Sequence, residues 1–560
     1  MRNRSRLRWP ALVAVAIGGL GLSACGGSNG KSNSDEAAPS ADAKKGGEIT
    51  IAYTSFPDFL DPATSYTVEG WAAMWNVYTP LLTYKHTEGA DGSSLIPGLA
   101  EAMPTVSAGG KTYTLKLRQG LKFSDGTPVK ASDFEHTIKR VLNLESGGSA
   151  FYFPIEGAEA YVKAGKADGD IIGITADDAT GEITIKLTSA VGSFSNVLAM
   201  DFAGIVPSTT KFANLSANPP PGVGPYKITS SKPTTEFTLE KNADFASFKI
   251  ADIPLGNLDK INVKVIKNQR KQVQDTISGA VDYMNDPPPA DQFREIKAKY
   301  ADRYKEFVTN STYYMFMNTR VAPFDKKEVR QAVNFALDKG ALARIFGGLL
   351  EPGCNFLPPG MKGYTKMDPC PYGDPTKPPD IEKAKQLVQA AGVAGTEVNV
   401  FGNDEEPSKP IAEYVADVLT QIGFKAKPQI VEGSVYFQTI GAQKTKAQIG
   451  FANWFQDYPH PDNFMFLVDG KSIQETNNQN FGNVDDPTIN AGIVKLKPNP
   501  DLDSIAGEWA ALDKRLVDEA LVAPYGHRKL TVFMSERMNF KDCTIVHPLY
   551  YADWAQFCLK

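Results

Sequence analysis

Histidine and cysteine are scarce in this chain, which has five of each among 560 residues. General acid–base catalysis most often uses histidine, so few candidates exist for it. The motifs of serine hydrolases, zinc metalloproteases and phosphate-binding loops do not occur in the sequence. There is no Cys-x-x-Cys pair and the histidines are widely spaced, so no pattern of zinc ligands is present. We therefore expect no catalytic residues, no metal and no cofactor.

The chain also lacks clustered basic residues. Its net charge is −5, and its first 24 residues hold four arginines and no acid, so the remainder is more acidic still. Proteins that bind nucleic acids concentrate Lys and Arg to neutralise phosphates. We therefore expect no nucleic-acid partner.

Only one long apolar run exists, at residues 9–22, and it is too short to span a bilayer comfortably. Arginines precede it, and Leu22-Ser23-Ala24-Cys25 ends it. This arrangement resembles a bacterial lipoprotein signal at 1–24 with its lipobox. The resemblance implies cleavage before Cys25 and attachment of lipid to that residue. The alternative is an ordinary secretory signal with an unrelated cysteine.

Residues 25–46 are rich in small and polar residues, with no aromatic or β-branched side chain. Such a segment cannot bury enough apolar surface to become ordered. We expect it to be a lipid-anchored, flexible linker that holds the protein at the extracytoplasmic face of a bacterial cell membrane. The length of the rest exceeds what one hydrophobic core usually supports, which predicts at least two lobes.

Four cysteines remain after the linker, and export would permit disulfides between them. Four cysteines allow three pairings. We favour Cys354 with Cys370 and Cys543 with Cys558, because these pairs close the shortest loops. Zinc binding is the rival interpretation.

Periodicity in the first half predicts extended and helical segments. Polar and apolar residues alternate at 111–118, as in a half-buried strand. Residues 71–82 have helical spacing, and we expect another helix that begins with Ser132 as its cap. Gly222 and Gly224 precede a proline, and we expect them to adopt positive φ in a tight turn.

In the second half, strands alternate with helices. Residues 397–401 and 424–429 are strand-like, whereas 380–392 and 410–423 are helix-like. This alternation favours an α/β lobe, while the hairpin-rich first half favours an α+β arrangement.

An aromatic loop with two prolines follows a short apolar run at 449–452. Proline ends regular structure, and loops held by rigid strands often carry binding groups. Asp457 lies in this loop between Trp454 and Tyr458. A carboxylate among aromatic rings needs a cationic partner, or it protonates. The alternative is a proline-rich turn in which the aspartate caps a backbone N–H.

Several segments, in a fixed order, resemble one known family. They are residues 97–101, 113–118, 122–129, 133–134, 222–227, 279–282, 317–339 and 454–464. The series resembles the dipeptide- and oligopeptide-binding family, the family 5 extracellular solute-binding lipoproteins that serve peptide ABC importers. The likeness covers residues 46–560.

The resemblance implies a two-lobed periplasmic-binding-protein-like fold of type II, in its large three-subdomain variant, with α/β and α+β parts. The first lobe would comprise residues 47–309 and a C-terminal return at 523–560, and the second lobe residues 310–522. Two chain crossings, near residues 308–311 and 522–525, would form a hinge.

The resemblance also assigns binding roles. Asp457 would hold the α-ammonium of a peptide, and Trp454 and Tyr458 would form cleft walls. For both rings, core packing beneath the loop is the alternative. Tyr66 would line the opposite wall, and we expect His460 at the rim of the cleft. No residue is marked as the partner of a ligand carboxylate.

The expected partners are a di- or oligopeptide, the permease subunits of an ABC importer and the membrane, with the protein a monomer. Two alternatives stay open. The same fold could bind an oligosaccharide or a metal chelate, and His460 and the prolines at 287–289 leave room for this. The chain could also be an exported hydrolase or a structural surface protein.

Overall fold

The computed structural model describes residues 44–144, 146–165, 167 and 169–560. The expected signal at 1–24, most of the linker at 25–46 and lipid attachment at Cys25 lie outside these residues. Within the described ranges, no helix has the length and apolar character needed to cross a membrane. The same ranges hold no group of three or more His, Cys, Asp or Glu residues that could bind a metal ion.

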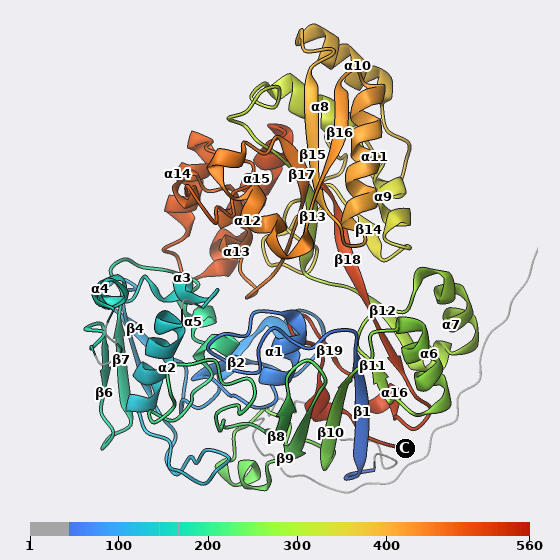
Figure 1. The fold of residues 1–560 in the computed structure, drawn as a ribbon. Coiled ribbons are helices and arrows are strands. Elements are labelled where there is room, and N and C mark those ends of the chain that lie inside the picture. The colour runs from blue at the N-terminus through green and yellow to red at the C-terminus, as the bar shows by residue number, and fades with distance from the viewer. Residues whose placement is uncertain (1–43, 145, 166, 168) are drawn as a thin grey trace, which may run out of the picture. The chain divides into compact units, whose positions relative to one another are not determined.

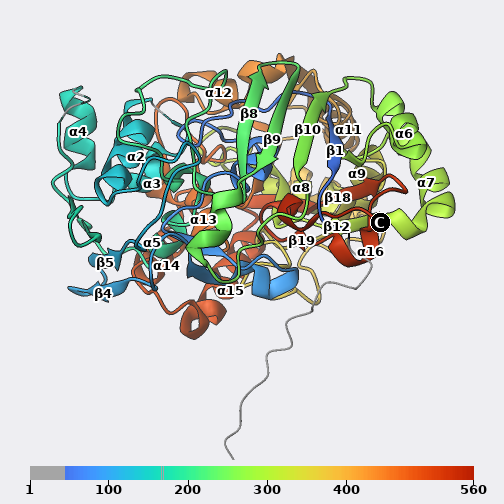
Figure 2. The same ribbon diagram turned by 90° about the horizontal axis from the view of Figure 1, so that it is seen from below.

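Strands from both halves of the chain share one twelve-stranded sheet, drawn in Figure 1. Its main path is β16-β15-β17-β13-β18-β11-β1-β10-β9-β8, and β12 and β14 also pair with β18. Figure 2 shows β8, β9, β10 and β1 side by side. The strands of this sheet are β1 (Glu48–Tyr53), β8 (Tyr226–Lys232), β9 (Glu236–Lys241), β10 (Lys260–Val265), β11 (Tyr283–Met284), β12 (Tyr304–Val308), β13 (Ser311–Met317), β14 (Leu350–Pro352), β15 (Glu397–Asn403), β16 (Lys425–Val431), β17 (Ile449–Phe455) and β18 (Val522–Met534).

Three smaller sheets complete the β-structure of the described residues. They are β4-β5-β7-β6, β2-β3 and β19-β20, built from β2 (Leu82–Tyr84), β3 (Leu95–Pro97), β4 (Thr105–Ser107), β5 (Thr112–Lys116), β6 (Ile174–Ala176), β7 (Glu182–Lys186), β19 (Val546–His547) and β20 (Tyr551–Ala552). The α-helices are α1 (Val68–Met74), α2 (Ser132–Asn143), α3 (Ser149–Tyr152), α4 (Ala158–Ala164), α5 (Phe194–Val197), α6 (Gln269–Ser278), α7 (Phe293–Lys299), α8 (Lys327–Ala336), α9 (Lys339–Ile345), α10 (Ile381–Ala390), α11 (Ser408–Gln421), α12 (Tyr436–Ile440), α13 (Asp462–Met465), α14 (Pro487–Leu496), α15 (Leu502–Asp518) and α16 (Phe540–Cys543).

Three large hydrophobic cores lie around these sheets. One is built from residues 313–525, and we call its part of the molecule the second lobe. The other two define the first lobe: one draws mainly on residues 63–253, and the other joins residues 49–283 to residues 532–559. In the second lobe, β15, β16 and β17 pair in parallel, as expected for an α/β arrangement.

The long strand β18 joins the two lobes because it changes partners along its length. Its first part pairs with β13 and β14 of the second lobe, and from Lys529 onward it pairs with β12. The other crossing, between β12 and β13, lies beside it: Thr309 N–H donates to Arg528 O at 2.8 Å, and Arg528 N–H donates to Ser311 Oγ at 3.1 Å. The first crossing falls at residues 308–311, and the second falls after Arg528, later than the expected 522–525.

The helix expected at residues 71–82 is shorter than its pattern suggested. α1 ends at Met74, and the next residues pair with the glycine turn: Thr79 N–H donates to Val223 O at 2.9 Å. Neither Gly222 nor Gly224 has the positive φ that we expected. Both are required for close approach, because a Cβ at Gly222 would lie 2.4 Å from Val77 O.

The expectation that Ser132 caps α2 is wrong. Ala131 occupies the N-cap position, and no side chain caps the helix. The backbone N–H and the hydroxyl of Ser132 instead donate to the carboxylate of Asp178, at 2.8 and 2.9 Å. A partner 46 residues away in sequence could not be read from the local pattern.

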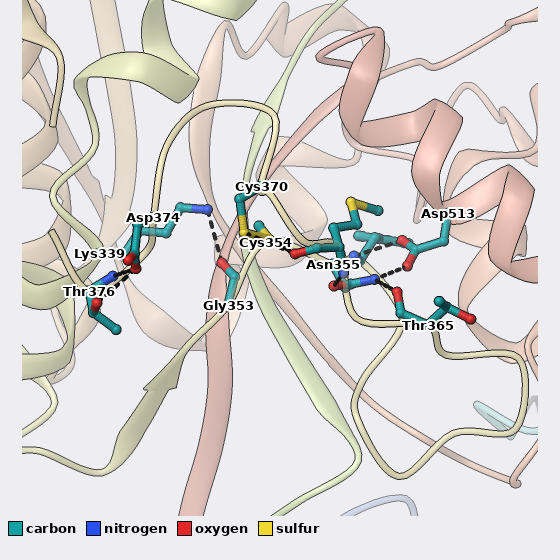
Figure 3. Close-up of a disulfide and its surroundings, with 11 residues drawn as sticks. Lys339, Gly353, Cys354, Asn355, Thr365, Cys370, Asp374, Thr376 and Asp513 are labelled. Carbon is teal, nitrogen blue, oxygen red and sulfur yellow. Dashed lines mark hydrogen bonds between the residues drawn. A yellow bond between two sulfur atoms is a disulfide. The ribbon is translucent and has the colours of Figure 1, made fainter.

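Both disulfides of the favoured pairing are present in the structure. Cys354 is bonded to Cys370, and Cys543 to Cys558. Figure 3 shows the first of them beside Asn355, whose side chain donates to Asp513 Oδ2 at 2.7 Å. The disulfide closes the 354–370 loop, and the hydrogen bond from Asn355 holds this loop against helix α15.

A buried ion pair fixes the segment that leads into α1. The guanidinium of Arg140 donates to both carboxylate oxygens of Asp61, at 2.9 and 2.6 Å, and neither side chain is exposed to solvent. Asp61 also accepts from the backbone of Ala63 and Leu215. The pair thus holds the start of the 61–67 turn against α2.

We predict that Asp61→Asn lowers the free energy of unfolding by about 3–5 kcal/mol, because it leaves a buried guanidinium without its counter-charge. Urea denaturation followed by circular dichroism measures this change. Glu159→Gln is the matched control, since it removes an exposed pair with Lys163 and should cost less than about 1 kcal/mol. Equal losses in the two variants would contradict the assignment.

Candidate functional site

A cavity of about 480 Å³ lies between residues of the two lobes. The first lobe contributes the start of α1 and two C-terminal residues, and the second lobe contributes the end of β17 and three neighbouring side chains. The lining residues are Tyr66, Thr67, Val68, Glu69, Trp71, Phe437, Asn453, Trp454, Phe455, Gln456, Asp457, Gln479, Phe481, Leu549 and Tyr551. The volume falls within the range of small-molecule sites.

Asp457 lies two residues after the end of β17 and is only 5% exposed. Asn463 holds it at two points: the backbone N–H of Asp457 donates to Asn463 Oδ1 at 2.8 Å, and Asn463 Nδ2 donates to Asp457 Oδ2 at 2.7 Å. The hydroxyl of Tyr66, from the first lobe, also hydrogen-bonds to this carboxyl group. The carboxyl is therefore fixed by neutral groups from both lobes.

No basic side chain of the described residues forms an ion pair with Asp457, so its charge is not balanced within the protein. Burial raises the pKa of Asp457 to about 7, although the hydrogen bonds from Asn463 and Tyr66 act in the opposite direction. A carboxyl group in this state would gain from a cation placed in the cavity.

The structure brings Trp454 and Tyr66 to the cavity along with Asp457. Trp454 Nε1 donates to Asn463 Oδ1 at 3.2 Å, and the Trp454 ring meets Phe466 edge-on at 5.1 Å. Trp454 belongs to β17 itself, because the strand continues three residues beyond the apolar run that marked it.

Tyr458 lies beside the cavity and does not line it. Its ring is 6% exposed, packs in a core of the first lobe and meets Phe151 edge-on at 5.9 Å. This placement corresponds to the core-packing alternative for Tyr458.

His460, expected at the rim, is 2% exposed. Its Nδ1 lies 2.6 Å from Asp462 Oδ1, and its ring meets Trp509 edge-on. Asp462 in turn accepts from the hydroxyl of Ser193 in the first lobe at 2.6 Å. The histidine therefore supports an interlobe contact and is not positioned to touch a ligand in the cavity.

The sequence analysis missed five polar lining residues: Thr67, Glu69, Asn453, Gln456 and Gln479. Glu69 lies in the first turn of α1, and Gln456 follows β17. Gln456 Nε2 donates to Pro548 O at 3.1 Å, whereas its buried Oε1 has no hydrogen-bond partner among the described residues. Neither Glu69 nor Gln456 has a pattern around it that could have marked it, since each reaches the cavity only through the tertiary fold.

Two lobes joined by two paired chain crossings, with an aromatic cavity and an unbalanced buried carboxyl group between them, define a solute-binding protein of the hinged type. The chain belongs to a known family of this class. The family described as bacterial extracellular solute-binding proteins, family 5 Middle, matches residues 94–475.

Relatives of known name agree with this assignment. The oligopeptide-binding protein OppA of Bacillus subtilis is 27% identical over 548 residues, which cover 92% of this chain and 93% of that protein. Heme-binding protein A of Haemophilus influenzae is 26% identical, over 87% of this chain and 89% of its own.

Solved structures show the same fold. The clavulanic acid biosynthesis oligopeptide binding protein 2 has a TM-score of 0.84 and 25% identity, covering 92% of this chain and 96% of that one. Haemophilus influenzae OppA in complex with RPPGFSPFR has a TM-score of 0.71 and 19% identity, covering 92% and 99%. The expected family and the two-lobed type II fold are confirmed.

We predict that Asn463→Ala lowers the free energy of unfolding by about 1–3 kcal/mol, because buried N–H groups of Trp454 and Asp457 lose their acceptor. The same change should raise the pKa of Asp457 further, because Asn463 donates to its carboxylate. Urea denaturation measures the first effect, and carbon NMR of labelled aspartate the second.

Asn490→Ala is the control for this variant. Asn490 also bridges a backbone N–H, that of Gly470, and an aspartate, Asp485, but it does not line the cavity. It should leave the titration of Asp457 unchanged. An unaltered Asp457 titration in Asn463→Ala would show that the amide does not control the carboxyl group.

Proposed function

We propose that this protein captures a di- or oligopeptide between its lobes and delivers it to the permease of an ABC importer. Attachment of lipid to Cys25 would hold it at the extracytoplasmic face of the cell membrane, on a linker at residues 25–46. Support for the peptide comes from the cavity chemistry and from relatives named as oligopeptide-, dipeptide- and di/tripeptide-binding proteins.

The observation that carries this proposal is the carboxyl group of Asp457, which is buried in the cavity without a cation. The α-ammonium of a peptide supplies a positive charge and up to three N–H donors to such a group. Asn463 and Tyr66 already orient the carboxyl group, so it loses little conformational freedom when the ammonium binds.

Ligand binding should also favour the state in which the lobes are together. Tyr66 of the first lobe and Asp457 of the second both line the cavity, so a ligand that contacts both gains most when they are close. Direct hydrogen bonds between the lobes support this state: Ser193 Oγ donates to Asp462, Gln456 Nε2 to Pro548 O, and Gly192 N–H to Lys497 O. The permease would then recognise the closed form.

We predict that Asp457→Ala lowers the affinity for a peptide with a free amino terminus by about two to four orders of magnitude, which corresponds to about 3–5 kcal/mol for loss of one partner of a buried ion pair. Isothermal titration calorimetry measures this loss. Asp485→Asn, a half-exposed carboxylate outside the cavity, is the protein control.

The amino terminus of the peptide provides the second control. An N-acetylated copy of the same peptide has no ammonium, so it should bind the wild-type protein weakly and respond little to Asp457→Ala. Unchanged binding of the free-amine peptide to the variant would remove Asp457 from this role.

We predict that affinity for a free-amine peptide is greatest between about pH 7 and 8. Below the Asp457 pKa of about 7, the carboxyl takes up a proton and must lose it to bind an ammonium, so affinity falls about tenfold per pH unit. Above about 7.7–8.0, the peptide ammonium loses its proton. Calorimetry across this range tests the profile, and Asp457→Asn should abolish its acidic limb.

A further inference from the structure

The ionisable side chains that line the cavity are acidic, and none is basic. Glu69 and Asp457 are its ionisable acids, and no Lys, Arg or His is among the residues that line it. A dipeptide with neutral side chains carries one positive and one negative terminus. Such a ligand would use one of the two acids and would find no counter-charge here for its carboxylate.

Glu69 approaches the cavity from the lobe opposite to Asp457. It lies in the first turn of α1, and its carboxylate forms no ion pair with any basic side chain of the described residues. Burial raises the pKa of Glu69 to about 7, and the nearby carboxylates of Asp286 and Asp58 act in the same direction. The surroundings of Glu69 are therefore acidic as well, and they favour a cation over an anion at this position.

The neutral part of the lining also suits a cation. Seven of the fifteen lining residues are aromatic, and the faces of aromatic rings attract ammonium and guanidinium groups. Gln456 adds a buried carbonyl oxygen that has no hydrogen-bond donor among the described residues.

We propose that the cavity selects peptides with a second positive charge near the amino terminus, a Lys or Arg side chain, with Asp457 binding the α-ammonium and Glu69 the side-chain cation. This inference rests on the proposed peptide-binding function and adds a specificity residue to it. The carboxyl terminus of the peptide would lie outside this cavity.

Glu69 has a competing structural explanation. An acidic residue in the first turn of a helix interacts favourably with the helix dipole, and this alone could account for it. That role would affect folding but would not discriminate between ligands. A comparison of two peptides on the same protein therefore separates the two explanations.

The test compares the tripeptides Lys-Ala-Ala and Ala-Lys-Ala with copies in which norleucine replaces lysine, because norleucine keeps the aliphatic chain and lacks the charge. Calorimetry on the wild-type protein should show at least a tenfold preference for one lysine peptide over its norleucine copy. Glu69→Gln should reduce that preference to about threefold or less. Asp457→Asn should weaken both peptides of the pair and leave their ratio in place.

Glu413→Gln on α11 is the matched control, since it removes the same charge at an exposed site outside the cavity and should preserve the ratio. Equal affinities for lysine and norleucine peptides in the wild-type protein would overturn the inference without any variant. The inference would also be overturned if the affinity ratio between the lysine and norleucine peptides stayed the same in Glu69→Gln. In both cases, Asp457-dependent binding would still support the proposed function.

If none of these peptides binds, the proposed function is refuted, and the inference with it. Binding of 1,5-diaminopentane but of no peptide would likewise overturn the peptide assignment, because a diamine offers two cations without a peptide backbone.

Discussion

The burial of one carboxyl group without a counter-charge is the constraint on which the site depends. Asp457 is 5% exposed, and its contacts, Asn463 and Tyr66, are neutral donors. Neutral donors offset only part of the cost of removing a carboxylate from water, so burial raises the pKa of Asp457 to about 7. In the proposed function, the ammonium of a peptide would remove that cost. Because Tyr66 belongs to the opposite lobe, the same event would also favour contact between the lobes.

The architecture lets this local event act on the whole molecule. β18 pairs first with strands of the second lobe and then with β12 of the first, while residues 308–311 cross beside it. The cavity residues come from both lobes: from the start of α1 and the C-terminal segment in the first, and from the end of β17, α12 and residues 479–481 in the second. In the proposed function, a ligand would therefore shift the population of closed molecules through contacts with a few side chains.

Features that depend on neighbouring residues could be predicted from the sequence. The aromatic loop with Asp457, the alternating strand at 112–116 and the shortest cysteine loops are of this kind. Features that depend on distant residues could not. Ser132 donates to Asp178. At position 222 only glycine fits, because Val77 lies too close for a side chain. Tyr458 resembled a cleft residue, but it packs into a core of the first lobe. Glu69, in the first turn of α1, reaches the cavity only through the tertiary fold.

The comparisons indicate where ligand choice must reside. Relatives named for oligopeptides, heme and glutathione resemble this chain at 25–27% identity, and solved structures keep the same fold at still lower identity. A backbone shared among proteins named for such different ligands cannot by itself select one of them. The selection must come from the side chains that line the cavity. In this chain those side chains are aromatic, aliphatic, hydroxyl, amide and acidic, with no base among them. If the ligand binds there as proposed, a cavity of that composition would stabilise positive charge and leave negative charge unpaired.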